Sequence, residues 1–145
     1  MTVSRIDGIR ELRRRQTAEC FTPTSLTNEI LDKLTCYSYR DLWEDETKTF
    51  LDPAVGNGNL LLPVLQRKIE VLEKAGRLNS QTLINALSSI YGIDIMRDDI
   101  RECRLRLLKE ISKYDKITEE HIRIVFKHII FLNRKRYPNG ALDYD

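Results

Sequence analysis

The sequence contains few prolines, cysteines and histidines, and disulfides and metal sites depend on the last two. Among its 145 residues are four prolines, no two adjacent, three cysteines and two histidines. Three cysteines cannot all form intramolecular disulfides, and no Cys-x-x-Cys pair occurs, so a reducing compartment is indicated. His121 and His128 have no cysteine or acid at ligand spacing, so we expect no metal site. We expect both histidines to be partly exposed.

Long apolar runs are also missing. No stretch of about eighteen apolar residues occurs, and the amino terminus is too polar for a secretion signal, so we expect a cytoplasmic protein. A hydrophobic content of 41% and a charged content of 32% are typical of a soluble globular chain. We expect a basic arm or helix over residues 1–16 and one domain over 17–145.

The net charge is only +2, but the positive charges are clustered. Two basic runs are candidates for contacts with DNA phosphates or with an acidic partner. They are Arg13, Arg14 and Arg15, and Arg134, Lys135 and Arg136. The arginines of residues 97–106 alternate with acids, and Glu102 and Arg106 have the spacing of a helical salt bridge, so a solvated face is favoured there.

The most informative segment is Asp-Pro-Ala-Val-Gly-Asn-Gly-Asn at residues 52–59. It follows a short apolar strand over residues 49–51 and precedes an amphipathic helix over roughly 59–74. Gly56 and Gly58 permit positive φ and a close approach of the backbone to a ligand. The start of the helix offers free amides to a carboxylate or phosphate, and Asp52 can accept from an ammonium group.

A second apolar strand, within residues 89–95, ends in Asp94. A carboxylate at the tip of the strand beside a nucleotide-type loop is placed to bind both ribose hydroxyls. Ile95 and Met96 then offer an apolar edge to an adenine ring. Asp94 could instead cap the helix that begins near Arg97, although Asp98 fits that role equally.

A third segment, Phe21-Thr22-Pro23, resembles the Phe-Thr-Pro motif that precedes the glycine loop in adenine-specific DNA methyltransferases. It also fits the start of a helix over residues 24–35. In their order and spacing, the three segments resemble the amino-terminal, cofactor-binding half of the N(6)-adenine DNA methyltransferases, which are class I enzymes. The resemblance covers residues 17–108.

This resemblance implies an α/β, Rossmann-like class I methyltransferase fold in truncated or minimal form, with three to four parallel strands flanked by helices. It implies S-adenosyl-L-methionine as the cofactor. The residues it assigns to that cofactor are Phe21, Thr22, Pro23, Asp52, Pro53, Ala54, Gly56, Gly58, Asn59, Asp94 and Ile95.

The family also has an Asp/Asn-Pro-Pro-Tyr/Phe segment that holds a flipped adenine, and nothing in this chain matches it. No catalytic residue is therefore assigned. Before that segment, the family has a strand whose tip contacts the adenine of the cofactor. Here Asn133, after residues 128–132, is the preferred match, and the alternative is residues 140–144, where Gly140 replaces the expected acid.

Two functions remain open at this stage. The chain can be the cofactor-binding part of an adenine-specific DNA methyltransferase, with a second polypeptide supplying the catalytic and target-recognition parts. It can equally be an inactive methyltransferase-like module that binds DNA or a regulatory partner.

Other segments show local patterns. We expect helices over residues 81–88 and 97–113, the latter with a buried stripe, and a helix capped by Thr118 with Ile122, Val125 and Phe126 at helical spacing. Residues 129–132 fit either a continued helix or a strand, residues 36–48 a loop or a short helical turn, and residues 138–140 a turn. The stripe consists of Ile100, Cys103, Leu107 and Ile111.

Overall fold

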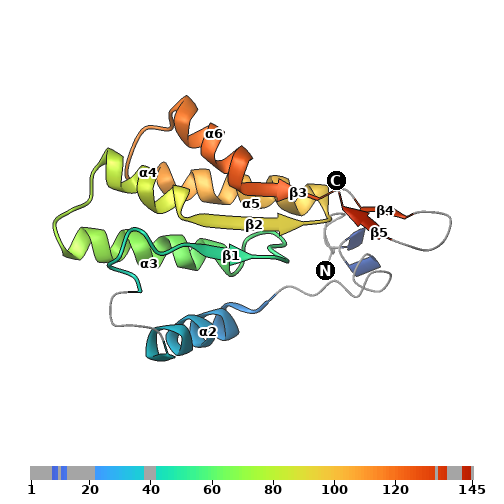
Figure 1. Cartoon of the computed structure of the whole chain (residues 1–145), viewed down its shortest axis with the longest axis horizontal. Coiled ribbons are helices and arrows are strands. Elements are labelled where there is room, and N and C mark those ends of the chain that lie inside the picture. The colour runs from blue at the N-terminus through green and yellow to red at the C-terminus, as the bar shows by residue number, and fades with distance from the viewer. Residues whose placement is uncertain are drawn as a thin grey trace.

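A computed structural model describes residues 8–9, 11–12, 22–37, 42–132, 134–136 and 142–144 of the chain. Helices and strands alternate through most of it (Figure 1). In order, the elements are α2 (Thr24–Tyr37), β1 (Phe50–Asp52), α3 (Leu61–Lys74), α4 (Ser80–Ser88), β2 (Ile90–Asp94), α5 (Arg97–Ile111), α6 (Glu119–His128), β3 (Ile129–Phe131), β4 (Arg134–Arg136) and β5 (Leu142–Tyr144).

The three central strands form a parallel sheet in the order β1-β2-β3. Asp52 lies in register with Gly92 of β2, and Asp94 with Phe131 of β3. Consecutive parallel strands connected by helices are what the βαβ rule requires and what half of a dinucleotide-type sheet contains. The predicted α/β class is therefore confirmed, with three parallel strands. β4 and β5 pair separately as an antiparallel hairpin.

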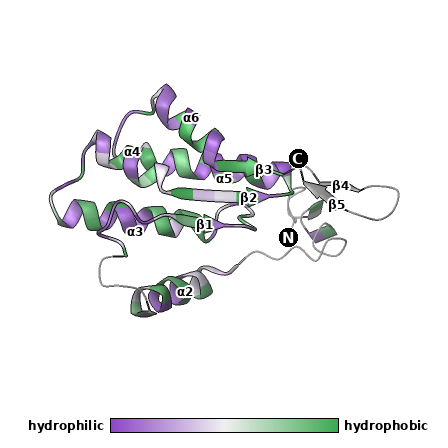
Figure 2. Cartoon of the chain, viewed as in Figure 1, coloured by the Kyte–Doolittle hydropathy of each residue, from purple (hydrophilic) through white to green (hydrophobic). Residues whose placement is uncertain are grey.

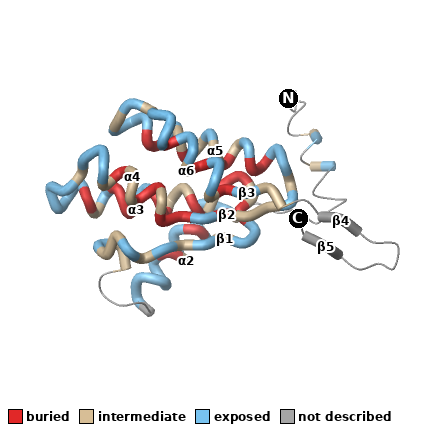
Figure 3. The backbone as a smooth tube through the Cα atoms, turned by 45° about the horizontal axis from the view of Figure 1, so that its top comes forward, coloured by how far each residue is buried: buried red, intermediate tan, exposed pale blue. Residues whose placement is uncertain are grey.

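The core lies between the helices and one face of this sheet. Ile90 of β2 and Ile129 of β3 are each 1% exposed, and they meet the apolar stripes of α3, α4 and α5. Figure 3 shows buried segments along these facing elements, and Figure 2 shows the mixed polar and apolar colouring of the helices around them. The predicted stripe of α5 is confirmed, because all four of its residues are buried.

Local sequence signals explain most of the helix boundaries. The long helix begins at Leu61, two residues later than expected, because residues 59 and 60 complete the turn that leaves the glycine loop. It ends at Lys74 with Ala75 as its C-cap, and Gly76, whose φ is 66°, turns the chain away so that the amide of Arg77 donates to the carbonyl of Leu72. Asn79 then caps α4 through a reciprocal pair of hydrogen bonds with Thr82.

The ambiguous segment after α6 is a strand. The chain leaves the helix at His128, and Ile129 pairs directly with Gly92. The expectation for His121 is wrong, because this side chain is only 1% exposed. Its Nδ1 accepts from the amide of Thr118 at 3.0 Å, so the histidine completes the capping box of α6 and is drawn into the core.

The opposite face of the sheet is apolar and open. Side chains alternate along a strand, so Leu51, Tyr91 and Ile130 lie on the face away from Ile90 and Ile129. Their exposed fractions are 62%, 36% and 41%. The ring of Tyr91 stacks on that of His128 at 4.2 Å between centroids. In the described part of the chain, helices therefore cover one face of the sheet, and apolar side chains are exposed on the other.

The longest described helix has 15 residues, and none of the described helices combines the length and apolar character needed to cross a membrane.

Candidate cofactor site

The glycine loop leaves β1 at the carboxyl edge of the sheet and folds back against β2. The amide of Val55 donates to the carbonyl of Ile93 at 2.9 Å. A Cβ on Gly92 would lie 2.8 Å from Cγ2 of Val55, which is too close for any substitution without movement. Gly92 is thus required for the loop to lie against β2. No local pattern singles out Gly92, because the requirement comes from Val55, 37 positions earlier in the glycine loop.

Both glycines of the loop adopt the left-handed conformation that the sequence predicts. The φ angles of Gly56 and Gly58 are 54° and 92°. A Cβ on Gly58 would lie 2.9 Å from Sγ of Cys103 on α5, so this glycine is also required by helix packing. Burial of the thiol raises the pKa of Cys103 to about 12. The sulfur therefore acts here as an apolar packing group.

Asp94 connects the loop to the tip of β2. Its Oδ2 accepts from the amide of Gly56 at 2.8 Å, and its Oδ1 accepts from the amide of Met96 at 2.8 Å. The N-cap of α5 is Met96 and makes no side-chain cap, so Asp94 does not cap the helix in the ordinary sense. A carboxylate offers about four acceptor positions, and these two bonds leave one on each oxygen for a ligand.

Asp52 ends β1 on the strand next to Asp94. Its Oδ1 accepts from the amide of Ala54 at 3.0 Å. Burial raises the pKa of Asp52 above its ordinary range, the bond from Ala54 opposes this, and the charge of Asp94 raises it further. Among the described residues, no cation lies within ion-pair distance of either carboxylate. The pair therefore favours a ligand that brings positive charge or hydroxyl donors.

Thr22 of the Phe-Thr-Pro segment lies beside the loop. Nδ2 of Asn59 donates to the carbonyl of Thr22 at 3.3 Å, across 37 positions of sequence. Oδ1 of Asn59 in turn accepts from Arg106 of α5 at 2.8 Å, and the same nitrogen of Arg106 donates to the carbonyl of Asn57 at 2.9 Å. Arg106 thus fixes the end of the loop, a role that its salt-bridge spacing with Glu102 did not indicate.

The loop also carries unused polar groups. Among the described residues, the amides of Asn59 and Leu60, just before α3, have no hydrogen-bond acceptor. Oδ1 of Asn57 is buried without a partner, while Nδ2 of the same side chain donates to Glu102 at 3.4 Å. Free amides at a helix start attract a carboxylate or phosphate. The site therefore combines acceptors at the strand tips with donors in the loop.

The remaining predicted cofactor residues are less well gathered. Pro53 and Ala54 are exposed on the loop, and Ile95, 45% exposed, follows Asp94. Pro23 is exposed, and its carbonyl accepts from the amide and hydroxyl of Thr27, so it also serves as the start of α2. Phe21 and Asn133 lie outside the described residues.

The predicted DNA contacts cannot be placed as side chains. Arg13, Arg14 and Arg15 lie outside the described residues, and Arg134, Lys135 and Arg136 are described only as the backbone of strand β4.

The arginines of α5 do not all lie on a solvated face of the helix. Arg104 donates through Nε and a terminal nitrogen to the carbonyl of Ile129, at 2.9 and 2.6 Å. With Arg106 on the loop, two of the four arginines satisfy backbone carbonyls. The expectation of a solvated face is therefore wrong for these two, because their side chains reach across to neighbouring elements.

No family model, curated protein or solved structure matches the chain.

Proposed function

We propose that this chain is the S-adenosyl-L-methionine-binding part of an adenine-specific DNA methyltransferase of class I. The observation that carries the proposal is the position of Asp52 and Asp94 at the tips of two neighbouring strands. Both carboxylates accept hydrogen bonds from amides of the glycine loop, which also has free amides. Both carboxylates lack a cation among the described residues, and Thr22 lies against the same loop.

The donor set suits each part of this cofactor. Asp52 binds the ammonium group, and the amides before α3 bind the carboxylate of the methionine moiety. The free lone pairs of Asp94 accept from the ribose hydroxyls, and Ile95 lies beside the adenine ring. When bound, the cofactor supplies the methyl group that is transferred to the amino group of adenine.

A second polypeptide fits the open face of the sheet. Parallel sheets are almost always covered on both faces, whereas here Leu51, Tyr91 and Ile130 remain exposed. Among the described residues, the outer edge of β1 pairs with no strand. We assign both surfaces to the polypeptide that carries the catalytic Asn/Asp-Pro-Pro-Tyr segment, because its own strands and helices would continue the sheet.

The alternative is a catalytically inactive methyltransferase-like module that binds DNA or a protein partner. The absence of adjacent prolines from the sequence favours it for the chain acting alone. A tritiated-methyl transfer assay on unmethylated DNA separates the two. Transfer by this chain alone would eliminate the inactive module, and transfer only after addition of a second polypeptide would support the split enzyme.

Calorimetric titration with S-adenosyl-L-methionine tests cofactor binding. We expect saturable binding by the native chain and at least tenfold weaker binding by Asp52→Asn, which keeps the acceptor for Ala54 but removes the charge. Glu73→Gln is the matched control, because it removes one exposed carboxylate from α3. Equal affinity of Asp52→Asn and the native chain would contradict the assignment of Asp52, and an absence of binding heat would contradict the cofactor.

A further inference from the structure

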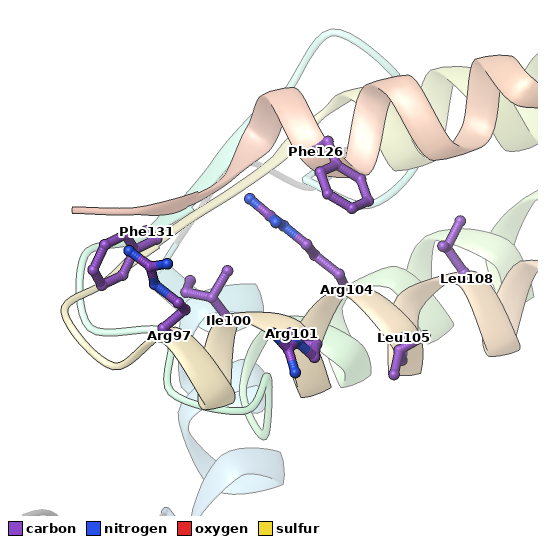
Figure 4. Close-up of a pocket in the computed structure, with 8 residues that line it drawn as sticks. All are labelled: Arg97, Ile100, Arg101, Arg104, Leu105, Leu108, Phe126 and Phe131. Carbon is purple, nitrogen blue, oxygen red and sulfur yellow. The ribbon is translucent and has the colours of Figure 1, made fainter. Parts of the chain in front are cut away.

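A second candidate site lies away from the glycine loop, in a groove between α5, α6 and β3. The groove has a volume of about 470 Å³, which is in the range of ligand-binding clefts. Figure 4 shows Arg97 over the ring of Phe131 and Arg104 extending from α5 toward Phe126 of α6. The carbon of each guanidinium lies 4.6 and 4.2 Å from the respective ring centroid.

Among the described residues, those that line the groove include three arginines and no acid. Arg97, Arg101 and Arg104 line it, and no carboxylate of the described residues lies within ion-pair distance of any of them. Arg104 is held in place by the carbonyl of Ile129 and by Phe126, and desolvation lowers its pKa. Guanidinium groups already oriented by aromatic rings and a carbonyl lose little further entropy when they bind a carboxylate.

The surroundings of these charges are apolar. Leu105 of α5 and Phe126 of α6 are 62% and 57% exposed, and Ile122, one turn before Phe126, is 43% exposed. Of the three apolar residues predicted at helical spacing in α6, only Val125 is buried, and His121, one turn before it, is buried as well. Phe126 is thus left exposed beside Arg104.

We propose that this groove binds an acidic amphipathic helix of a partner protein. Its carboxylates would pair with Arg97 and Arg101 at the rim, and its apolar side chains would cover Leu105 and Phe126. Arginine and aromatic residues around an apolar centre are typical of the residues that dominate protein interfaces. A nucleic-acid backbone fits less well, since it has no apolar side chain to cover Leu105, and Arg104 already occupies one face of the Phe126 ring.

The test uses the whole chain and a displayed library of randomised 16-residue helical peptides. Peptides selected on the native chain are measured by fluorescence anisotropy against two groove variants, Arg101→Glu and Leu105→Ser. Both positions are exposed and make no described hydrogen bond through their side chains, so both variants should fold. Lys74→Glu, at the end of α3, makes the same change of charge outside the groove.

We expect the selected peptides to combine glutamate or aspartate with apolar residues at i and i+4. Each groove variant should weaken their binding at least tenfold, and Lys74→Glu should leave it unchanged. Selection of peptides without acidic enrichment, or equal binding to Arg101→Glu, would overturn the proposal. So would a duplex DNA oligonucleotide that binds the native chain more tightly than the peptides and loses binding in Arg101→Glu. Cofactor titration is unaffected by these outcomes, so the groove and the cofactor site can fail separately.

Discussion

The amide of Gly56 donates to Oδ2 of Asp94 over 2.8 Å and fixes the glycine loop of β1 to the tip of β2. The other oxygen of Asp94 holds the amide of Met96, at the start of α5. One carboxylate thus positions two segments of the site while keeping acceptor capacity for a ligand.

Asp94→Ala should destabilise the chain as well as weaken cofactor binding. The change leaves two amides without their acceptors, which costs about 1–3 kcal/mol of unfolding free energy. Urea denaturation measures this cost. Asp32→Ala serves as control, because Asp32 makes an exposed ion pair with Arg67 that is worth at most about 1 kcal/mol. Equal stability of the two variants would show that Asp94 does not hold the loop.

Gly58→Ala should cost more stability than Gly76→Ala. Both glycines have positive φ, at 92° and 66°, so both variants carry a backbone strain of about 1–2 kcal/mol. Only at Gly58 would the added Cβ also meet a packed atom, Sγ of Cys103, and overpacking adds about 1–3 kcal/mol. Urea denaturation of the two variants measures the difference, and Cys103→Ala should reduce it. Indistinguishable costs would contradict the described packing of the loop on α5.

Asp52→Asn should raise stability near neutral pH. Burial raises the pKa of Asp52, so the favourable contribution of its protonated form is lost as the pH rises through the folded-state pKa. Asp52→Asn has no carboxyl group to ionise at this position, so it does not lose this stability. Its advantage over the native chain should be present at pH 7 and shrink as the pH falls to about 4, the ordinary range of an aspartate.

Melting temperatures of Asp52→Asn and of the native chain, measured from pH 7 down to about pH 4, show which protein is more stable at each pH. A variant that is less stable than the native chain at pH 7 would show that the carboxylate of Asp52 is stabilised in the fold.

Leu51→Thr should change surface properties and leave stability almost unaltered. Leu51 is 62% exposed on the open sheet face, and threonine keeps a high strand propensity, so the unfolding free energy should change by about 0.5 kcal/mol or less. The fluorescence of a bound apolar dye should fall. Leu65→Thr, at a position with 0% exposure, is the control and should lose about 2–5 kcal/mol. A large loss at Leu51 would mean that this face is already covered.

Much of the fold follows from local sequence patterns. The apolar stripe of α5, the end of the long helix at residue 74 and the strand that ends in Asp94 depend on neighbouring residues, and the structure confirms each of them. The strand nature of Ile129 could not be predicted, because a short apolar run fits helix or strand until the pairing with Gly92 is known. The burial of His121 could not be predicted for a similar reason, since its capping bond from the amide of Thr118 is known only from the structure.

In the candidate site too, some features could be predicted from the sequence and others could not. The positive φ angles of Gly56 and Gly58 and the position of Asp94 at a strand tip could be read from spacing. The contacts of Gly92 with Val55 and of Arg106 with the loop join residues far apart in sequence, and no local pattern encodes them. Local spacing therefore predicts the loop conformation and the strand tip, whereas the residues that hold the loop in place are determined by packing between distant segments.

Binding of S-adenosyl-L-methionine by the loop between β1 and α3 can be measured by NMR, through amide chemical shifts during titration with this compound. We expect saturable shifts at Gly56, Gly58, Asn59 and Ile95, with little change at Leu105 or Phe126 in the α5–α6 groove. Saturable shifts confined to other parts of the chain, or no shifts at millimolar cofactor, would contradict it.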